Sequence, residues 1–351
     1  MKALVVVIIA FFQSSALFAA PLQIGTTYSP KQSEYLEVDR KETYLAVIEM
    51  GFDVIRLGAY WDEIEREEGV YDFSRLEWQV KEARKRGIKV ALTVGMKAPR
   101  WPEYFIPEWV LKKADLPRGS DVSKSEYLRQ KTLQFIEETV NRYENDPAIH
   151  YWQVENEPLL RIGPGDWFIG KEFLTEEVAL VRKLDSRKRP IILTVPTYPN
   201  KTLKFIMNLK NKYDSLEESL GVADIIGLNV YPAIGQKFWG INFYFHTKQK
   251  EREIYFGQIL DKIKNKGKKA WVVELQAEPW EPGQLVYKGS ERPPTGQPGM
   301  AEEYFNELEG LGVDTILLWG AEYWRFRELR HEDAEWMKAI KGILKKNKEK
   351  P

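Results

Sequence analysis

The feature that most constrains this chain is a regular alternation of two kinds of segment. Short runs rich in β-branched and aliphatic residues alternate with longer charged stretches in which apolar residues recur at helical spacing, as in 74–86, 125–143 and 175–184. Eight short runs are present: 22–27, 53–58, 88–94, 149–155, 190–195, 224–230, 269–275 and 314–319. Runs that are almost continuously apolar, such as VALTV and TILLW, are typical of parallel strands buried on both faces.

Eight strand–helix units predict an α/β fold, the (β/α)₈ or TIM barrel, as a single domain over residues 21–351. An open, doubly wound sheet is the main alternative, but no GxGxxG motif follows the first strand. The longest insertions follow the third, sixth and seventh strands, at 95–124, 233–250 and 276–298. Because the loops after the strands build the site in this fold, we expect these insertions to form its walls.

Residues 1–20 have the pattern of a secretory signal peptide. Lys2 precedes an apolar run from Ala3 to Phe12, and small residues then lead to Pro21. The apolar run is shorter than the roughly 20 residues that a membrane span needs, and an uncleaved anchor is the alternative. The pattern predicts a secreted, periplasmic or cell-surface protein that contacts a membrane only if the leader is retained.

The composition excludes several classes of function. The 52 basic and 52 acidic side chains give no net charge, so we expect no nucleic-acid partner. There is no cysteine, which excludes thiol catalysis, and only three histidines, which leave little for a metal centre. We therefore expect no metal or organic cofactor. His150, inside the fourth strand, is expected to be an interior residue.

Two glutamates stand at the ends of two predicted strands. The fourth strand continues as WQVENEP and the seventh ends as VVELQ, which places Glu157 and Glu274 at the same, carboxyl-terminal rim. A carboxylate in an apolar barrel mouth is costly unless it is paired or neutral, so two facing one opening suggest a working pair. Glycoside hydrolysis needs one protonated carboxyl group to donate to the leaving oxygen and one carboxylate to attack the anomeric carbon or activate water.

Several neighbours are candidates to support this pair. Asn156 can hydrogen-bond a sugar hydroxyl next to the reacting carbon. Arg56, at the end of the second strand, can hold Glu274 ionised by charge and hydrogen bonding. Tyr231, after the sixth strand, is a second partner for that carboxylate, and Asn229 is a further candidate for substrate binding.

Two alternatives remain open at these strand ends. Glu155 shares a strand face with Glu157 by alternation, so a bulge would decide which of them points inward. Glu278 follows Glu274 by four residues, and a surface or capping role is expected for it.

The chain is rich in aromatic residues, with 12 Trp, 17 Tyr and 16 Phe. Many of them must be core residues, because aromatic side chains bury large areas. Flat rings in a cleft also stack on the C–H faces of sugars. The tryptophans expected to contact substrate are Trp61, Trp101, Trp319 and Trp324.

The segments WQVENEP, VVELQAEPW, DVIRLG, GLNVYP and LLWGAEYW together resemble the retaining β-glycosidases of clan A of the glycoside hydrolases. Cellulase-like family 5 and β-galactosidase-like family 42 are the most similar families, and the resemblance covers the mature chain in strand order. It implies that Glu157 is the acid/base and Glu274 the nucleophile, with Arg56, Tyr231 and Trp319 in the site. The chain lacks the histidines that many family 5 members carry around the site.

The sequence therefore predicts an exported retaining β-glycosidase, a monomer that acts on an oligo- or polysaccharide. Long aromatic loops favour an endo-acting β-glucanase or β-mannanase, and an exo-acting β-galactosidase is the alternative. A non-catalytic sugar-binding barrel would need neither glutamate, and a metal-dependent hydrolase would need more histidines. Retention of configuration predicts carboxyl groups about 5–5.5 Å apart.

Overall fold

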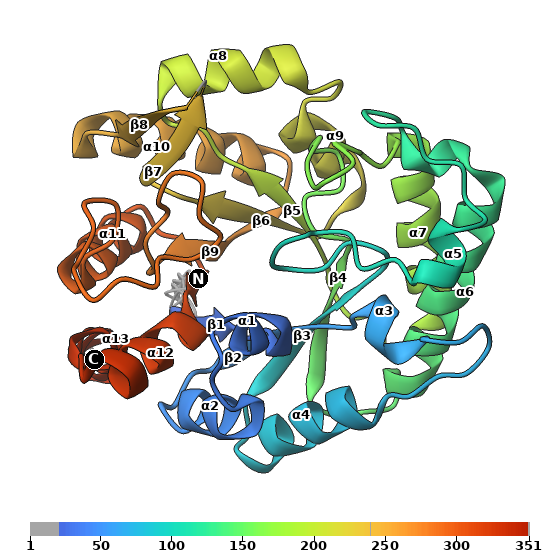
Figure 1. Cartoon of the computed structure of the whole chain (residues 1–351), viewed down its shortest axis with the longest axis horizontal. Coiled ribbons are helices and arrows are strands. Elements are labelled where there is room, and N and C mark those ends of the chain that lie inside the picture. The colour runs from blue at the N-terminus through green and yellow to red at the C-terminus, as the bar shows by residue number, and fades with distance from the viewer. Residues whose placement is uncertain (1–20, 239, 350–351) are drawn as a thin grey trace, which may run out of the picture.

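The protein, seen in a computed structural model that describes residues 21–238 and 240–349, is built around a closed barrel of parallel strands (Figure 1). The expected leader, residues 1–20, lies outside the described residues. The barrel strands are β1 (Gln23–Thr27), β2 (Val54–Gly58), β3 (Lys89–Val94), β4 (Ile149–Val154), β5 (Ile191–Pro196), β6 (Ile225–Val230), β9 (Lys269–Gln276) and β10 (Thr315–Trp319). They match all the predicted strands within one residue at either end, which confirms the TIM barrel.

Helices surround the barrel and connect its strands (Figure 1). The outer helices are α2 (Arg40–Ile48), α4 (Ser74–Lys85), α6 (Glu126–Tyr143), α7 (Lys171–Leu184), α9 (Ser215–Val222), α10 (Gln249–Asn265), α11 (Pro298–Gly310), α12 (Ala321–His331) and α13 (Glu335–Lys348). Segments that follow strand ends add α1 (Pro30–Tyr35), α3 (Trp61–Ile64), α5 (Glu108–Leu111), the 3-10 turn η1 (Val122–Lys124) and α8 (Lys201–Lys210). The three predicted helices are α4, α6 and α7, and the Ser125 side chain caps α6 as an N-cap serine should.

The barrel interior changes from apolar to polar along the strands. Its apolar part is a buried cluster of Val54, Ala91, Ile192, Ile225, Trp271, Val273 and Leu317. Arg56, Thr194 and Trp319 each follow a member of this cluster by two residues. Strand alternation therefore places them on the same inward face, nearer the carboxyl-terminal mouth.

Glu274 reaches the mouth because β9 is irregular. Leu228 of β6 pairs with Val272, but the next residue, Asn229, pairs with Glu274, so Val273 is an extra residue in the ladder. Val273 belongs to the interior cluster, and Gly227 leaves room for it, since a Cβ on Gly227 would lie 2.9 Å from Val273 Cγ1. The bulge turns Val273 and then Glu274 toward the inside.

The insertion at 233–250 is not only a loop. It contains an antiparallel hairpin of β7 (Ala233–Phe238) and β8 (Ile241–His246), which stands apart from the barrel sheet. Gln276 fixes its base, because its side chain accepts from Ala233 N at 3.0 Å and donates to Ala233 O at 2.6 Å. Ile241 and Tyr244 on this hairpin are exposed.

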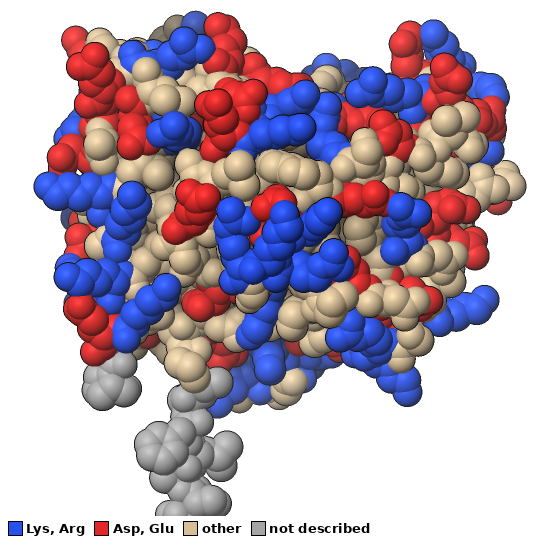
Figure 2. Space-filling model, turned by 90° about the horizontal axis from the view of Figure 1, so that it is seen from below, with Lys and Arg blue, Asp and Glu red and all other residues tan. Residues whose placement is uncertain are grey.

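The outer surface carries mixed charge. Figure 2, which views the molecule of Figure 1 from below, shows basic and acidic side chains interspersed on that face.

The expectation that His150 is interior is wrong. His150 is exposed at the amino-terminal end of β4, and its Nδ1 lies 2.9 Å from Ala148 O. No helix within residues 21–238 or 240–349 is long and apolar enough to cross a membrane.

Candidate active site

Glu274 lies at the barrel mouth with a donor on each carboxylate oxygen. Arg56 Nη2 donates to Oε1 at 2.6 Å, and the Tyr231 hydroxyl donates to Oε2 at 2.6 Å. Arg56 is fully buried and is fixed by Thr27 Oγ1 at 2.8 Å and Gln153 Oε1 at 3.2 Å. The Glu274 carboxylate is thus fixed by a buried cation and a phenol, one on each oxygen.

Glu157, on the segment that follows β4, has the opposite surroundings. It is 9% exposed, and burial, together with the charges of Glu274 and Glu103, raises its pKa to about 8. Lys97 and a hydrogen bond from Asn229 oppose this rise, and the bond joins Asn229 Nδ2 to Glu157 Oε1 at 2.8 Å. At neutral pH the carboxyl group is therefore mainly protonated, with Oε2 left to carry the proton.

The backbone of Glu157 is held in a conformation that non-glycine residues rarely adopt. Its φ is 43°, in the left-handed region. Its N–H donates to Thr194 Oγ1 at 2.6 Å, and its carbonyl accepts from Lys97 Nζ at 2.7 Å. Such a strained residue persists only where its neighbours hold it, and here β5 and the loop after β3 hold it from two sides.

Glu155 has a structural role, which separates it from Glu157. Its buried carboxylate accepts from the backbone N–H groups of Met96 at 2.8 Å and Lys97 at 2.5 Å. Gly95 makes room for it, because a Cβ there would lie 2.1 Å from Oε1. Burial raises the pKa of Glu155 to about 7 and that of the adjacent, buried Glu177 well above its usual range. The two carboxyl groups form a pair inside the protein.

Asn156 and Asn229 surround the two site glutamates. Asn156 Oδ1 accepts from Gln153 Nε2 at 3.3 Å and from Thr194 Oγ1 at 3.4 Å, and its Nδ2 donates to Glu103 Oε2 at 3.1 Å. Asn229 is the strand partner of Glu274 and the hydrogen-bond donor to Glu157. The structure thus brings together side chains from β2, β6, β9 and the segment after β4 that the sequence singled out.

Of the four predicted substrate-contacting tryptophans, two lie near this site or on its loops. Trp319 ends β10, 6.4 Å from the Tyr231 ring between centroids, and the Arg100 guanidinium lies 3.9 Å from the Trp319 ring centroid. Trp101, on the loop after β3, is 46% exposed.

The prediction for Trp61 and Trp324 is wrong, because both are fully buried in the layer between strands and helices. Trp61 stacks on Phe135 with centroids 5.3 Å apart, and Trp324 Nε1 donates to Ala277 O at 2.7 Å. Both belong to helices that follow strand ends, α3 and α12, and their rings turn back into the core.

Sequence reasoning missed the charged residues of the loop after β3. Lys97 is fully buried, Arg100 is buried, and Glu103 is half-buried. The expected surface or capping role of Glu278 is wrong, because Glu278 is buried and ion-paired with Arg100, which also pairs with Glu322 at 2.6 Å. The only sequence signal was the position of KAPRWPE in an insertion directly after a strand.

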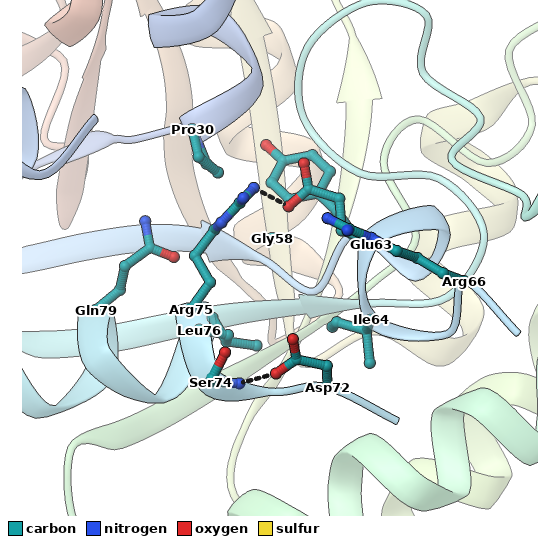
Figure 3. A pocket seen from close by; sticks show the side chains of 11 residues that line it. Pro30, Gly58, Glu63, Ile64, Arg66, Asp72, Ser74, Arg75, Leu76 and Gln79 are labelled. Atoms are coloured by element: carbon teal, nitrogen blue, oxygen red, sulfur yellow. Dashed lines mark hydrogen bonds and ion pairs between the residues drawn. The ribbon is translucent and has the colours of Figure 1, made fainter. Parts of the chain in front are cut away.

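A small cavity of about 80 Å³ lies beside α4, apart from these carboxylates (Figure 3). Two pairs of its polar groups bond to each other, Arg75 with Glu63 and Ser74 with Asp72, as Figure 3 shows. Among the described residues, no group of three or more His, Asp and Glu side chains is arranged to hold a metal ion.

The parallel barrel, the Asn–Glu pair after its fourth strand and the paired glutamate in its seventh together resemble the site of the clan A glycoside hydrolases. The sequence profile of glycoside hydrolase family 42, described as β-galactosidase, matches residues 27–162. The β-galactosidase BgaH of Haloferax lucentense is 30% identical over 145 residues, which are 39% of this chain and 21% of that protein. The profile match includes Arg56, Asn156 and Glu157 and ends before Glu274.

Solved structures share the fold. A β-galactosidase from the Antarctic haloarchaeon Halorubrum lacusprofundi matches with a TM-score of 0.57 and 15% identity, over 85% of this chain and 52% of that chain. Xylanase 10B from Thermotoga maritima matches with a TM-score of 0.58 and 16% identity, over 94% of this chain and 97% of that chain. The chain thus spans about half the length of this solved β-galactosidase, and the curated relative above matches over 21% of its length.

Proposed function

We propose that the chain is a retaining β-glycosidase that removes a terminal sugar from β-galactosides. The observation that carries this proposal is the contrast between the two glutamates at the mouth. Glu274 is held by Arg56 and Tyr231, while burial and nearby negative charge raise the pKa of Glu157 to about 8. The two glutamates thus differ as double displacement requires: one is held by donors on both oxygens, and the other is kept protonated to donate a proton.

In the first step Glu274 attacks the anomeric carbon of the bound sugar. The bond from that carbon to the leaving oxygen breaks as the new bond to a Glu274 oxygen forms, and Glu157 gives its proton to the leaving oxygen. Arg56 and Tyr231 keep Glu274 oriented, each on a different carboxylate oxygen. The product of this step is a glycosyl ester on Glu274, with Glu157 now ionised.

In the second step water replaces the leaving group. Glu157, as a carboxylate, takes a proton from the water. At the same time the water oxygen attacks the anomeric carbon, and the bond from that carbon to Glu274 breaks. Asn229 donates to Glu157 Oε1 and stabilises the ionised form that this step needs. Lys97 adds a nearby positive charge with the same effect.

The choice of β-galactosides rests on the similarity of residues 27–162 to family 42. The predicted endo-acting β-glucanase or β-mannanase has less support, because the likeness to a xylanase is one of fold at 16% identity. The observation in favour of the polysaccharide alternative is that Ile241 and Tyr244 on the hairpin are exposed. Export, directed by residues 1–20, is part of the proposal.

A substrate panel tests this proposal. The full chain is assayed on aryl β-galactosides, β-glucosides, β-mannosides and β-xylosides and on β-glucan and β-mannan, and the product sizes are measured. We expect the highest kcat/KM on β-galactosides, with β-galactose as the first-formed anomer. Oligosaccharide products from a polysaccharide would support the endo-acting alternative, and no turnover of any substrate would contradict the proposed function.

A further inference from the structure

Glu103 is a third carboxylate at the mouth, and the two-glutamate mechanism does not use it. It belongs to the loop between β3 and α5, which folds back on itself: Ala98 N donates to Glu103 O at 3.1 Å, and Glu103 N donates to Arg100 O at 2.9 Å. Arg100 and Glu103 have φ values of 92° and 76°, left-handed values that cost energy for non-glycine residues. This strained loop holds Glu103 against the site.

The contacts of Glu103 place it beside the reacting atoms. Its Oε2 accepts from Asn156 Nδ2 at 3.1 Å, and the charges of Lys97, Glu274 and Arg56 all act on it. Burial raises the pKa of Glu103 to about 7. Unlike Glu155, it is half-buried rather than fully enclosed, so its carboxylate lies at the edge of the space that substrate would occupy.

Asn156 and Glu103 together match the chemistry of a hydroxyl group. A hydroxyl oxygen can accept a hydrogen bond and its proton can donate one. The Oδ1 of Asn156 already accepts from Gln153 and Thr194, so its Nδ2 is the atom left to face a ligand as a donor. The Glu103 carboxylate lies directly beside Nδ2 and is an acceptor. A hydroxyl placed between them would accept from the amide and donate to the carboxylate.

We propose that Glu103 is a substrate-binding residue that, with Asn156, recognises the hydroxyl on the sugar carbon next to the anomeric carbon. This inference rests on the proposed function, because that function brings a sugar to Glu274. In the free protein the direct bond between Asn156 and Glu103 keeps both groups oriented. Binding replaces this bond by two bonds to the sugar hydroxyl.

Glu103 also acts on the acid/base through space. The groups that act on Glu157 are Glu274 of β9 and Glu103, whose negative charges oppose its ionisation, and Lys97 and Asn229, which favour it. Tyr198, after β5, also lies within range of the charge of Glu157. Removing the Glu103 charge therefore lowers the pKa of Glu157, and the alkaline limb of kcat/KM moves below pH 8.

Two substitutions separate these two effects. Glu103→Gln removes the charge but keeps an acceptor oxygen, and Glu103→Leu removes the acceptor as well. The full chain and both variants are assayed across pH on an aryl β-galactoside and on the matching 2-deoxy substrate. Glu108→Leu, an exposed glutamate on α5 that pairs with Lys112 at the surface, is the matched control. Thermal unfolding of every variant confirms that it is folded.

We expect Glu103→Leu to lower kcat/KM on the parent substrate by roughly tenfold to a hundredfold, the range for a hydrogen bond to a charged group. On the 2-deoxy substrate the same variant should lose much less, and Glu103→Gln should move the alkaline limb to lower pH. Equal losses on both substrates with an unmoved alkaline limb would overturn the inference.

A binding measurement keeps this test separate from the proposed function. Calorimetric titration with galactose and 2-deoxygalactose compares the wild type with Glu103→Leu without any turnover. A difference between the two sugars that disappears in the variant supports the inference even if no glycoside is hydrolysed. Turnover without that difference in either assay overturns the role of Glu103 alone.

Discussion

Glu157 and Glu274 lie at the same barrel mouth and have the same side chain, yet their surroundings are opposite. Glu274 is on a strand, between Arg56 and Tyr231, so donors surround both of its oxygens. Glu157 is on the segment after a strand, where burial and two neighbouring carboxylates raise its pKa to about 8. The comparison teaches that the role of each glutamate is set by what the adjacent strand ends and loops place around it.

Removing Glu274 should have the largest effect. We expect Glu274→Ala to lower kcat by about 10⁴-fold or more, because the attacking group is lost and the remaining site cannot form the ester. Kinetics on an activated aryl galactoside measure this loss. Added azide should restore turnover with inverted configuration, and a variant that keeps full activity would show that Glu274 is not the nucleophile.

Glu157→Gln should have the next largest effect. Loss of the proton donor should cost about 10²–10⁴-fold with a poor leaving group and much less with a good one. In the wild type, kcat/KM should fall as the pH rises through about 8, because the proton is then lost from Glu157. A profile without an alkaline limb near this pH would argue against this assignment.

Tyr231→Phe tests Glu274 separately from Glu157, because of the two glutamates only Glu274 loses a hydrogen bond. One hydrogen bond to Glu274 Oε2 is lost, and we expect kcat/KM to fall roughly tenfold. The alkaline limb should stay where it is, since Tyr231 does not contact Glu157. Asn229→Ala is the matched control: it removes a bond that favours the ionised form of Glu157, so its alkaline limb should move to higher pH.

The smallest expected effect is on stability and involves the neighbouring glutamate pair. Burial raises the pKa of both Glu155 and Glu177, so protonation of this pair stabilises the folded state at low pH. That stabilisation is lost as the pH rises through about 7, and Tm should fall over this range. Glu177→Gln should flatten the dependence of Tm on pH, which thermal unfolding at several pH values measures. An unchanged slope would show that the pair does not titrate in this range.

The barrel was predictable from the sequence because its strands and helices have different apolar periods. The same periodicity located Arg56, Glu157, Glu274 and Trp319, since a strand end in a parallel barrel is a fixed place at one rim. The bulge at Val273 was not predicted, because an extra residue in a continuous apolar run leaves no mark in the pattern.

The loops could not be predicted in the same way. Trp61 and Trp324 follow strand ends as site residues often do, but the helices α3 and α12 turn their rings into the core. Glu103, Arg100 and Lys97 reach the site through a loop closed by its own backbone hydrogen bonds and by left-handed residues. No period in the sequence specifies such a conformation, so none of these charged residues was predicted for the site.

The most direct test of the account is to trap the sugar on Glu274. In a Glu157→Ala variant, a dinitrophenyl β-galactoside needs no acid to leave, but no base remains to activate water. We predict that the glycosyl-enzyme accumulates and that mass spectrometry finds one hexose on the peptide that contains Glu274. A sugar on another residue, or rapid turnover with no adduct at any time, would contradict the account.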